Sequence, residues 1–296
     1  MQTILKGKGA EVRIDPAGPI VMIGEKINPT GNKKLAAALG AANFDYVRQL
    51  AMRQVEAGAQ VLDVNAGVTG LDEAALLPEV VKAVISQVDV PLCLDSGNPK
   101  ALAEALAVTP GKPLVNSVNG EESRLRAVLP IVKDRGAAVI GLTMDDRGIP
   151  TDPETRLSIA GRILERAAKM GIAPEDVVID PLVLSVGADQ NAAAVTLKTI
   201  ELVRREFGVN INLGASNVSF GLPDRHTINQ AFLALAFGAG ANCVITDPTK
   251  LAGTVLACDL LFGRDRYGKR YIAHTRKQQR TAGPGGWGRM DSANIS

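Results

Sequence analysis

The sequence predicts an α/β protein folded as a closed (β/α)8 TIM barrel, and three observations lead to this prediction. Eight apolar runs of strand length alternate strictly with segments of helical periodicity, a pattern that indicates a parallel sheet. Eight such units within 296 residues fit one barrel, which usually takes about 250 residues. No Gly-x-Gly-x-x-Gly pattern follows the first run, although an open dinucleotide-binding sheet would need one there.

The expected strands are short apolar runs with few polar residues inside them. Continuous runs of this kind, rather than alternating ones, indicate strands that are buried on both faces, as barrel strands are. In chain order the expected strands span 20–24, 60–64, 91–94, 113–115, 137–142, 177–179, 210–213 and 242–245.

The expected helices follow these strands, and several carry recognisable ends. Asp152 and Asp247 each precede a proline, so each can cap a helix that holds the proline in its first turn. Glycines just past a periodic segment mark helix ends, and here they are Gly58, Gly136, Gly171 and Gly208. In chain order the expected helices span 44–57, 73–87, 99–107, 121–135, 154–170, 192–207, 225–237 and 248–262.

A single domain is expected over residues 1–275, followed by a polar, glycine-rich tail over 276–296 that we expect to be flexible. A Gly-x-Gly-x-x-Gly pattern does occur at 283–288. No strand is expected before it, so we interpret it as part of the tail and not as a phosphate-binding turn.

Composition argues against several classes of function. The net charge is +2 and aromatic residues make up 3%, so neither a nucleic-acid partner nor a membrane is expected. Cys93, Cys243 and Cys258 lack the spacing of zinc ligands or redox pairs, so no bound metal is expected. The first residues lack the apolar core of a signal peptide, and we therefore expect a cytoplasmic protein.

Polar side chains close five of the apolar runs. In a β/α barrel the carboxyl ends of the strands converge on one mouth, so these side chains are expected to meet around one ligand. The segments are Leu62-Asp63-Val64-Asn65, Leu94-Asp95-Ser96, Val115-Asn116-Ser117, Ile179-Asp180-Pro181 and Gly214-Ala215-Ser216-Asn217. A set rich in Asp and Asn but poor in His, Cys and Lys suits a neutral heterocycle with N–H donors and ring acceptors, rather than a metal or a phosphate.

Structural roles are the alternative for each of these residues. An Asp at a strand end can cap the next helix or pair with an arginine, because a buried carboxylate needs a partner. Asn217 can be an ordinary loop residue that caps the following helix, and Arg225 can either reach into the mouth or close the barrel by a salt bridge. His226 and His274 have no triad partner in view, and no Gly-x-Ser-x-Gly segment occurs, so nucleophilic serine chemistry is not expected.

Together with the segment from Ile23 to Gly31, which reads Ile-Gly-Glu-Lys-Ile-Asn-Pro-Thr-Gly, these motifs resemble the pterin-binding barrel of methyltetrahydrofolate:corrinoid methyltransferases. The same barrel forms the folate domain of cobalamin-dependent methionine synthase. The resemblance covers about 19–275 and keeps the family order of motifs. Lys26 is a departure, since many relatives carry an arginine there.

The resemblance implies a role for each site residue. Asp95, Asn116 and Asp180 would bind the pterin ring, whose 2-amino group and N3–H form a donor pair that a carboxylate can accept. Asn217 would be the catalytic residue that assists at N5 of the folate. The remaining substrate-binding residues would be Glu25, Asp63, Asn65, Gly214, Ser216 and Arg225.

The resemblance also implies an activity, the transfer of a methyl group between N5 of tetrahydrofolate and the cobalt of a corrinoid (cobalamin). The sequence leaves the direction open, since both acetogenic and O- or N-demethylation pathways use such a transfer. No Asp-x-His-x-x-Gly pattern occurs, so the corrinoid is expected on a separate protein. A homodimer is expected from family analogy.

Two alternative functions stay open. One is a dihydropteroate synthase, whose Asn-x-Thr-x-Asp-Ser-Phe and Arg-x-His patterns are missing here. The other is a non-catalytic folate-binding module, which would not need Asn217.

Overall fold

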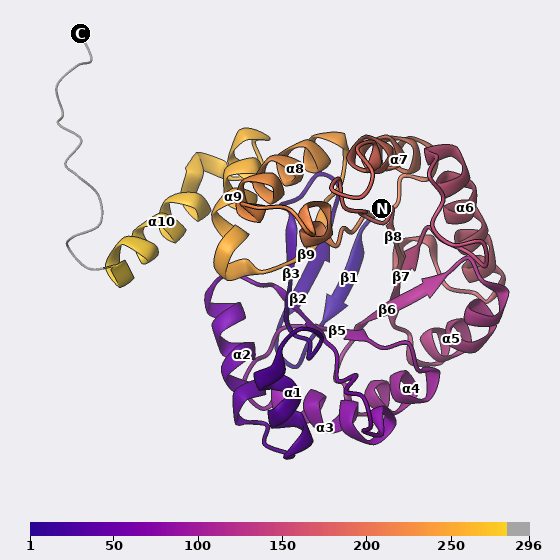
Figure 1. Ribbon diagram of the computed structural model, residues 1–296, viewed down its shortest axis with the longest axis vertical. Coiled ribbons are helices and arrows are strands. Elements are labelled where there is room, and N and C mark those ends of the chain that lie inside the picture. The colour runs from indigo at the N-terminus through magenta and orange to yellow at the C-terminus, as the bar shows by residue number, and fades with distance from the viewer. Residues whose placement is uncertain (283–296) are drawn as a thin grey trace, which may run out of the picture.

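The computed structural model describes residues 1–282, in which a ring of parallel strands is surrounded by helices (Figure 1). Seven strands form one sheet in the order β8-β7-β6-β5-β4-β3-β9. They are β3 (Val21–Ile27), β4 (Val61–Val64), β5 (Leu92–Asp95), β6 (Leu114–Asn119), β7 (Ala138–Leu142), β8 (Val177–Asp180) and β9 (Cys243–Thr246).

The segment expected as the seventh barrel strand lies between the two edges of this sheet. Ile211 pairs with Ile179 of β8, and Gly214 pairs with Ile245 of β9, both in parallel. The Asn212 N–H donates to the Ile179 carbonyl over 2.9 Å, and the Ile245 N–H donates to the Leu213 carbonyl over 2.8 Å. These contacts join β8 to β9 through an extended segment and confirm the predicted (β/α)8 barrel.

The eight expected helices are all present and begin or end where their caps predict. The side chains of Asp152 and Asp247 accept the N–H groups of Thr155 and Thr249. Gly136 ends its helix in the left-handed conformation, with φ of 63°. The helices are α2 (Asp45–Glu56), α3 (Glu73–Ile85), α4 (Pro99–Val108), α5 (Glu122–Arg135), α6 (Pro153–Lys169), α7 (Ala192–Phe207), α8 (Arg225–Ala239) and α9 (Pro248–Leu261).

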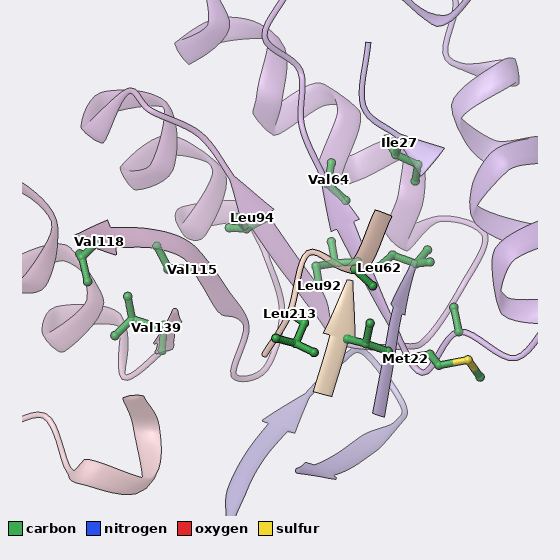
Figure 2. Close-up of a cluster of buried hydrophobic side chains, with 14 of the residues drawn as sticks. Met22, Ile27, Leu62, Val64, Leu92, Leu94, Val115, Val118, Val139 and Leu213 are labelled. Atoms are coloured by element: carbon green, nitrogen blue, oxygen red, sulfur yellow. The ribbon is translucent and has the colours of Figure 1, made fainter. Parts of the chain in front are cut away.

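The strands bury both of their faces. One set of alternating side chains points outward and packs against the helices, as Leu62, Leu92 and Val139 do (Figure 2). The other set points into the barrel and forms a second, smaller core. Its strand members are Val21, Ile23, Val61, Cys93, Leu114, Ala138, Ile140, Val178 and Cys243.

A hairpin that the sequence pattern did not predict closes the amino end of the barrel. Strands β1 (Thr3–Lys6) and β2 (Glu11–Ile14) pair antiparallel, and Leu5 and Ile14 are fully buried in the inner core. The Asn210 amide donates to the Thr3 hydroxyl and to the Ile14 carbonyl. The carboxyl end of the barrel is left as the open mouth.

Two helices were also not predicted. Helix α1 (Lys33–Gly40) follows β3 and is capped by the Asn32 side chain. Helix α10 (Lys269–Ala282) extends away from the barrel (Figure 1), so the first part of the expected tail, 276–282, is helical. The glycine-rich pattern at 283–288 lies outside the described residues. No helix within 1–282 is long and apolar enough to cross a membrane.

Candidate functional site

Four of the predicted site residues lie on the barrel strands themselves. Asp63, Asp95, Asn116 and Asp180 occupy β4, β5, β6 and β8. The residues two positions earlier point into the barrel core, namely Val61, Cys93, Leu114 and Val178. Because residues i and i+2 share a face of a strand, the four polar side chains also point inward, one step nearer the mouth.

These side chains line a cavity of about 880 Å³ at the carboxyl end of the barrel. Seven of the ten predicted site residues belong to its wall: Glu25, Asp63, Asp95, Asn116, Asp180, Gly214 and Asn217. Two of the other three are one contact away, since Asn65 donates to Asp95 and Ser216 donates to Glu25. Arg225 is two contacts away, because it donates to the Ser216 carbonyl. The structure therefore gathers the whole predicted set at one mouth.

Asp180 is held rigidly at the wall of the cavity. Its Oδ1 accepts the Leu182 N–H over 2.9 Å, and its Oδ2 accepts the Asn212 amide over 2.8 Å. Burial raises the pKa of this carboxyl to about 6. The nearby Arg156 donates to the Pro181 and Leu182 carbonyls and not to Asp180. The alternative that Asp180 forms an ion pair with an arginine is thus wrong.

Asp63 and Asp95 lie at different depths on neighbouring strands. Asp63 is level with Cys93 in the β4–β5 register, two residues deeper than Asp95. The Asn65 amide donates to Asp95 over 3.1 Å, and the Asn116 amide donates to Asp63 over 3.2 Å. Burial and the charge of Asp95 raise the pKa of Asp63 to about 8, and burial also raises the pKa of Asp95. Burial and the neighbouring carboxyl therefore favour the protonated form of Asp63 at the floor of the cavity.

We expect Asp63→Asn to stabilise the ligand-free protein at pH 8 and to change its stability little at pH 4. The pKa of the carboxyl rises from an ordinary 3.8 to about 8 on folding. Between these values the unfolded chain releases a proton that the folded protein keeps, so the wild type loses stability as the pH rises from 4 to 8. Asparagine has no proton to lose, so the advantage of the variant over the wild type should grow steadily from pH 4 to pH 8.

Urea unfolding of both proteins at pH 4, 6 and 8 measures this gain. Asp134→Asn, an exposed change on α5, is the control and should shift the unfolding free energy little at each pH. An Asp63→Asn variant that is destabilised equally at all three pH values would contradict the protonated floor.

The loop after the segment 210–214 carries the predicted catalytic residue. It forms a short 3-10 helix, η2 (Ala215–Ser219), and places Asn217 at the edge of the cavity. A Cβ at Gly214 would lie 3.3 Å from the Asn217 amide nitrogen, so glycine gives this amide its space. No hydrogen bond joins the Asn217 side chain to another residue within 1–282.

The helix-capping alternatives are wrong for both Asp95 and Asn217. Helix α4 is capped by Asn98, whose side chain accepts the N–H groups of Lys100 and Ala101. Helix α8 starts after Asp224 without any side-chain cap. Arg225 reaches back to the loop, where it donates to the Ser216 carbonyl over 2.6 Å and to the Ser219 hydroxyl over 3.1 Å.

Several lining residues were missed from the sequence. The end of β3 adds Lys26 to the cavity wall, the connection to α1 adds Asn28 and Asn32, and the start of α1 adds Lys33. The polar run Asn-Pro-Thr-Gly-Asn in that connection was the available signal. Asn212, which holds Asp180, is fully buried in an apolar run. A buried amide needs a partner, and its position inside a strand could have indicated one.

The described residues contain no group of three or more His, Cys, Asp or Glu side chains that could hold a metal ion. His226 lies on the first turn of α8, and His274 lies on α10, where its ring is 2.9 Å from the Gln278 amide. The polar side chains that line the main cavity are carboxyls, amides, lysines and the Thr30 hydroxyl.

Comparison with known proteins shows one matching family and two kinds of relative. The family model described as pterin binding enzyme matches residues 24–247. A methylcorrinoid:tetrahydrofolate methyltransferase of Eubacterium limosum is 32% identical over 85% of this chain and 94% of its own length. A methionine synthase of Mycobacterium tuberculosis is 29% identical over 78% of this chain, but this match covers 21% of that protein.

Solved structures share the fold at lower identity. A Yersinia pestis dihydropteroate synthase with a pterine–sulfa conjugate superposes with a TM-score of 0.68 at 20% identity, over 88% of this chain and 99% of that one. A Xanthomonas albilineans dihydropteroate synthase with 4-aminobenzoic acid gives 0.67 at 22%, over 90% and 99%. At this identity the likeness concerns the barrel and not the reaction.

Proposed function

Because the chain belongs to the pterin binding enzyme family, we propose that it transfers a methyl group between N5 of tetrahydrofolate and the cobalt of a corrinoid carried by a separate protein. The observation that carries this proposal is the convergence of Asp95, Asn116 and Asp180 on one cavity, beside the unpaired amide of Asn217. The similarity to a methylcorrinoid:tetrahydrofolate methyltransferase over nearly its whole length supports it.

The three inner residues would bind the pterin ring. A carboxylate accepts two parallel N–H groups, which matches the 2-amino group and N3–H of a pterin. An amide can serve one ring acceptor and one ring donor together. Since Asp180 and Asn116 are already oriented by Asn212 and Asp63, little side-chain entropy would be lost when the ring binds.

Asn217 would act at N5, where the carbon–nitrogen bond forms or breaks. A bare nitrogen anion is a very poor leaving group, so N5 must gain a proton or a strong hydrogen bond as the bond breaks. A contact that strengthens in the transition state raises the rate, and the Asn217 amide is free to supply it. Forward and reverse transfer share one transition state, so the same residue serves both directions.

The corrinoid, as the second substrate, supplies the cobalt that receives or gives the methyl group. Its approach needs an open cavity above the pterin, and the barrel provides this at its carboxyl end, since the hairpin β1–β2 fills the other end. No residue of this chain needs to act as a nucleophile.

The dihydropteroate synthase alternative is disfavoured by the residue after β9. The synthase pattern Arg-x-His is missing there, and Asp247 occupies the first position after the strand and caps α9 through Oδ1. A non-catalytic binding module is disfavoured by the unpaired amide of Asn217, which a binding role alone does not require.

Spectral turnover of free cobalamin tests the proposal. Purified protein with methyltetrahydrofolate should consume the cob(I)alamin absorption band and produce methylcobalamin, and the reverse mixture should produce methyltetrahydrofolate. A pterin pyrophosphate with 4-aminobenzoate should give no product. Condensation without methyl transfer would support a synthase instead, and tight folate binding without either reaction would support a binding module.

A further inference from the structure

A second cavity lies beside the first at the mouth of the barrel. Its volume is about 220 Å³, and Glu25 and Lys26 line both cavities. The starts of α8 and α9 provide most of its remaining wall, including Arg225, His226, Asn229, Asp247 and Lys250. This volume accommodates several water molecules at ~30 Å³ each, or one group of amino-acid size, but not a second pterin with its substituents.

The second cavity carries an excess of positive charge. Lys26, Arg225 and Lys250 contribute three cations, and Glu25 and Asp247 contribute two carboxyls, with Asp247 Oδ2 3.6 Å from Lys26 Nζ. Arg225 donates to a carbonyl and a hydroxyl and forms no ion pair within 1–282, and burial raises the pKa of Glu25, which weakens the negative charge that faces Arg225. Lys250 forms no ion pair with any residue up to 282. An anionic group would therefore be attracted here.

The floor of the second cavity holds an acceptor without a donor. Asn229 is 8% exposed, and its Oδ1 has no hydrogen-bond partner among the described residues. Buried side-chain oxygens are nearly always hydrogen-bonded. An occupant should thus bring an N–H or O–H donor in addition to its negative charge.

On the basis of the folate chemistry proposed above, we propose that the second cavity binds the glutamyl tail of the folate. A glutamyl group has carboxylates for the lysines and the arginine, and its amide N–H can donate to Asn229. Each further γ-linked glutamate repeats the same carboxylate and N–H pair. The pterin itself is neutral and cannot compensate the cations. Glu25 and Lys26 line both cavities, so a tail that leaves the main cavity beside them would enter the second one.

Three ligands that differ only in the tail test this assignment: tetrahydropteroate, which lacks glutamate, tetrahydrofolate with one glutamate, and its triglutamate. Lys250→Gln removes one exposed cation without disturbing the core. We expect the affinity for the triglutamate to fall about five-fold, with a smaller fall for the monoglutamate and none for tetrahydropteroate. Added salt should weaken triglutamate binding more than tetrahydropteroate binding to the wild type.

Lys100→Gln is the matched control. Lys100 is exposed, follows the first-turn proline of α4 at the same end of the barrel, and lies outside both cavities. It should leave all three affinities unchanged. An equal loss for all three ligands with Lys250→Gln, or no loss for any, would overturn the tail site while leaving the proposed function standing. Failure of the wild type to bind any of the three would overturn the proposed function and this inference together.

Discussion

Asn217→Ala is expected to lower the rate of cob(I)alamin methylation by about 10²–10³-fold, the usual effect of removing one donor to a developing charge. The dissociation constant for methyltetrahydrofolate should change much less, because the hydrogen bond to N5 strengthens only as the nitrogen gains a proton. The free energy of unfolding should stay within about 0.5 kcal/mol of the wild-type value, because the Asn217 side chain caps no helix and Asn217 is exposed.

Stopped-flow traces of the cob(I)alamin band measure the rate, and calorimetry without corrinoid measures the affinity. Asn217→Asp keeps the size of the side chain but, when ionised, offers no donor, so it should be as slow as Asn217→Ala. Asn191→Ala is the control. Asn191 directly precedes α7, its side chain is exposed, and it does not cap the helix. Equal losses in rate and affinity would mean that Asn217 contributes binding and not catalysis.

Asp180→Asn should lower the affinity for methyltetrahydrofolate by about ten- to a hundred-fold, because a hydrogen bond to a charged group contributes about 1.5–3 kcal/mol. The change keeps the shape of the side chain and replaces one acceptor with a donor, which would face the N–H groups of the pterin. The Leu182 N–H keeps an oxygen partner, and a rotated Asn212 amide can accept the new N–H through its Oδ1, which has no partner among the described residues, so the fold should survive.

The pH dependence of binding identifies Asp180 more specifically. Burial raises its pKa to about 6 in the ligand-free protein, and the bound form needs the carboxylate. Wild-type affinity should therefore fall with each unit below pH 6, by about ten-fold per protonated group. In Asp180→Asn this fall should become shallower, and the part that remains belongs to other carboxyls such as Asp95.

Titration calorimetry at pH 5, 6, 7 and 8 gives both the loss and its pH dependence, with a melting curve at each pH to verify folding. Asp134→Asn should reproduce the wild-type profile. If Asp180→Asn binds as tightly as the wild type, or keeps the full fall below pH 6, Asp180 does not contact the pterin.

The sequence by itself determined the architecture and the chemical character of the mouth. Strand runs and helical segments alternate because each must bury an apolar face, and this information lies within each segment. Helix caps such as Asp152 and Asp247 are equally local, since the capping side chain and its N–H partner are two or three residues apart. The Asp and Asn residues at the strand ends were identifiable because burying them in an apolar run is costly without a partner.

Only the tertiary structure decided how deep each polar side chain lies in the barrel, how the amino end of the barrel is closed, and which distant residues line the second cavity. The stagger between β4 and β5 places Asp63 below Asp95, and this depth raises the pKa of Asp63. The hairpin β1–β2 is stable because its two apolar side chains enter a core built from strands far along the chain. The second cavity is likewise lined by residues from the end of β3, from η2 and from the starts of α8 and α9. Such features depend on contacts between distant segments, so no local pattern of residues encodes them.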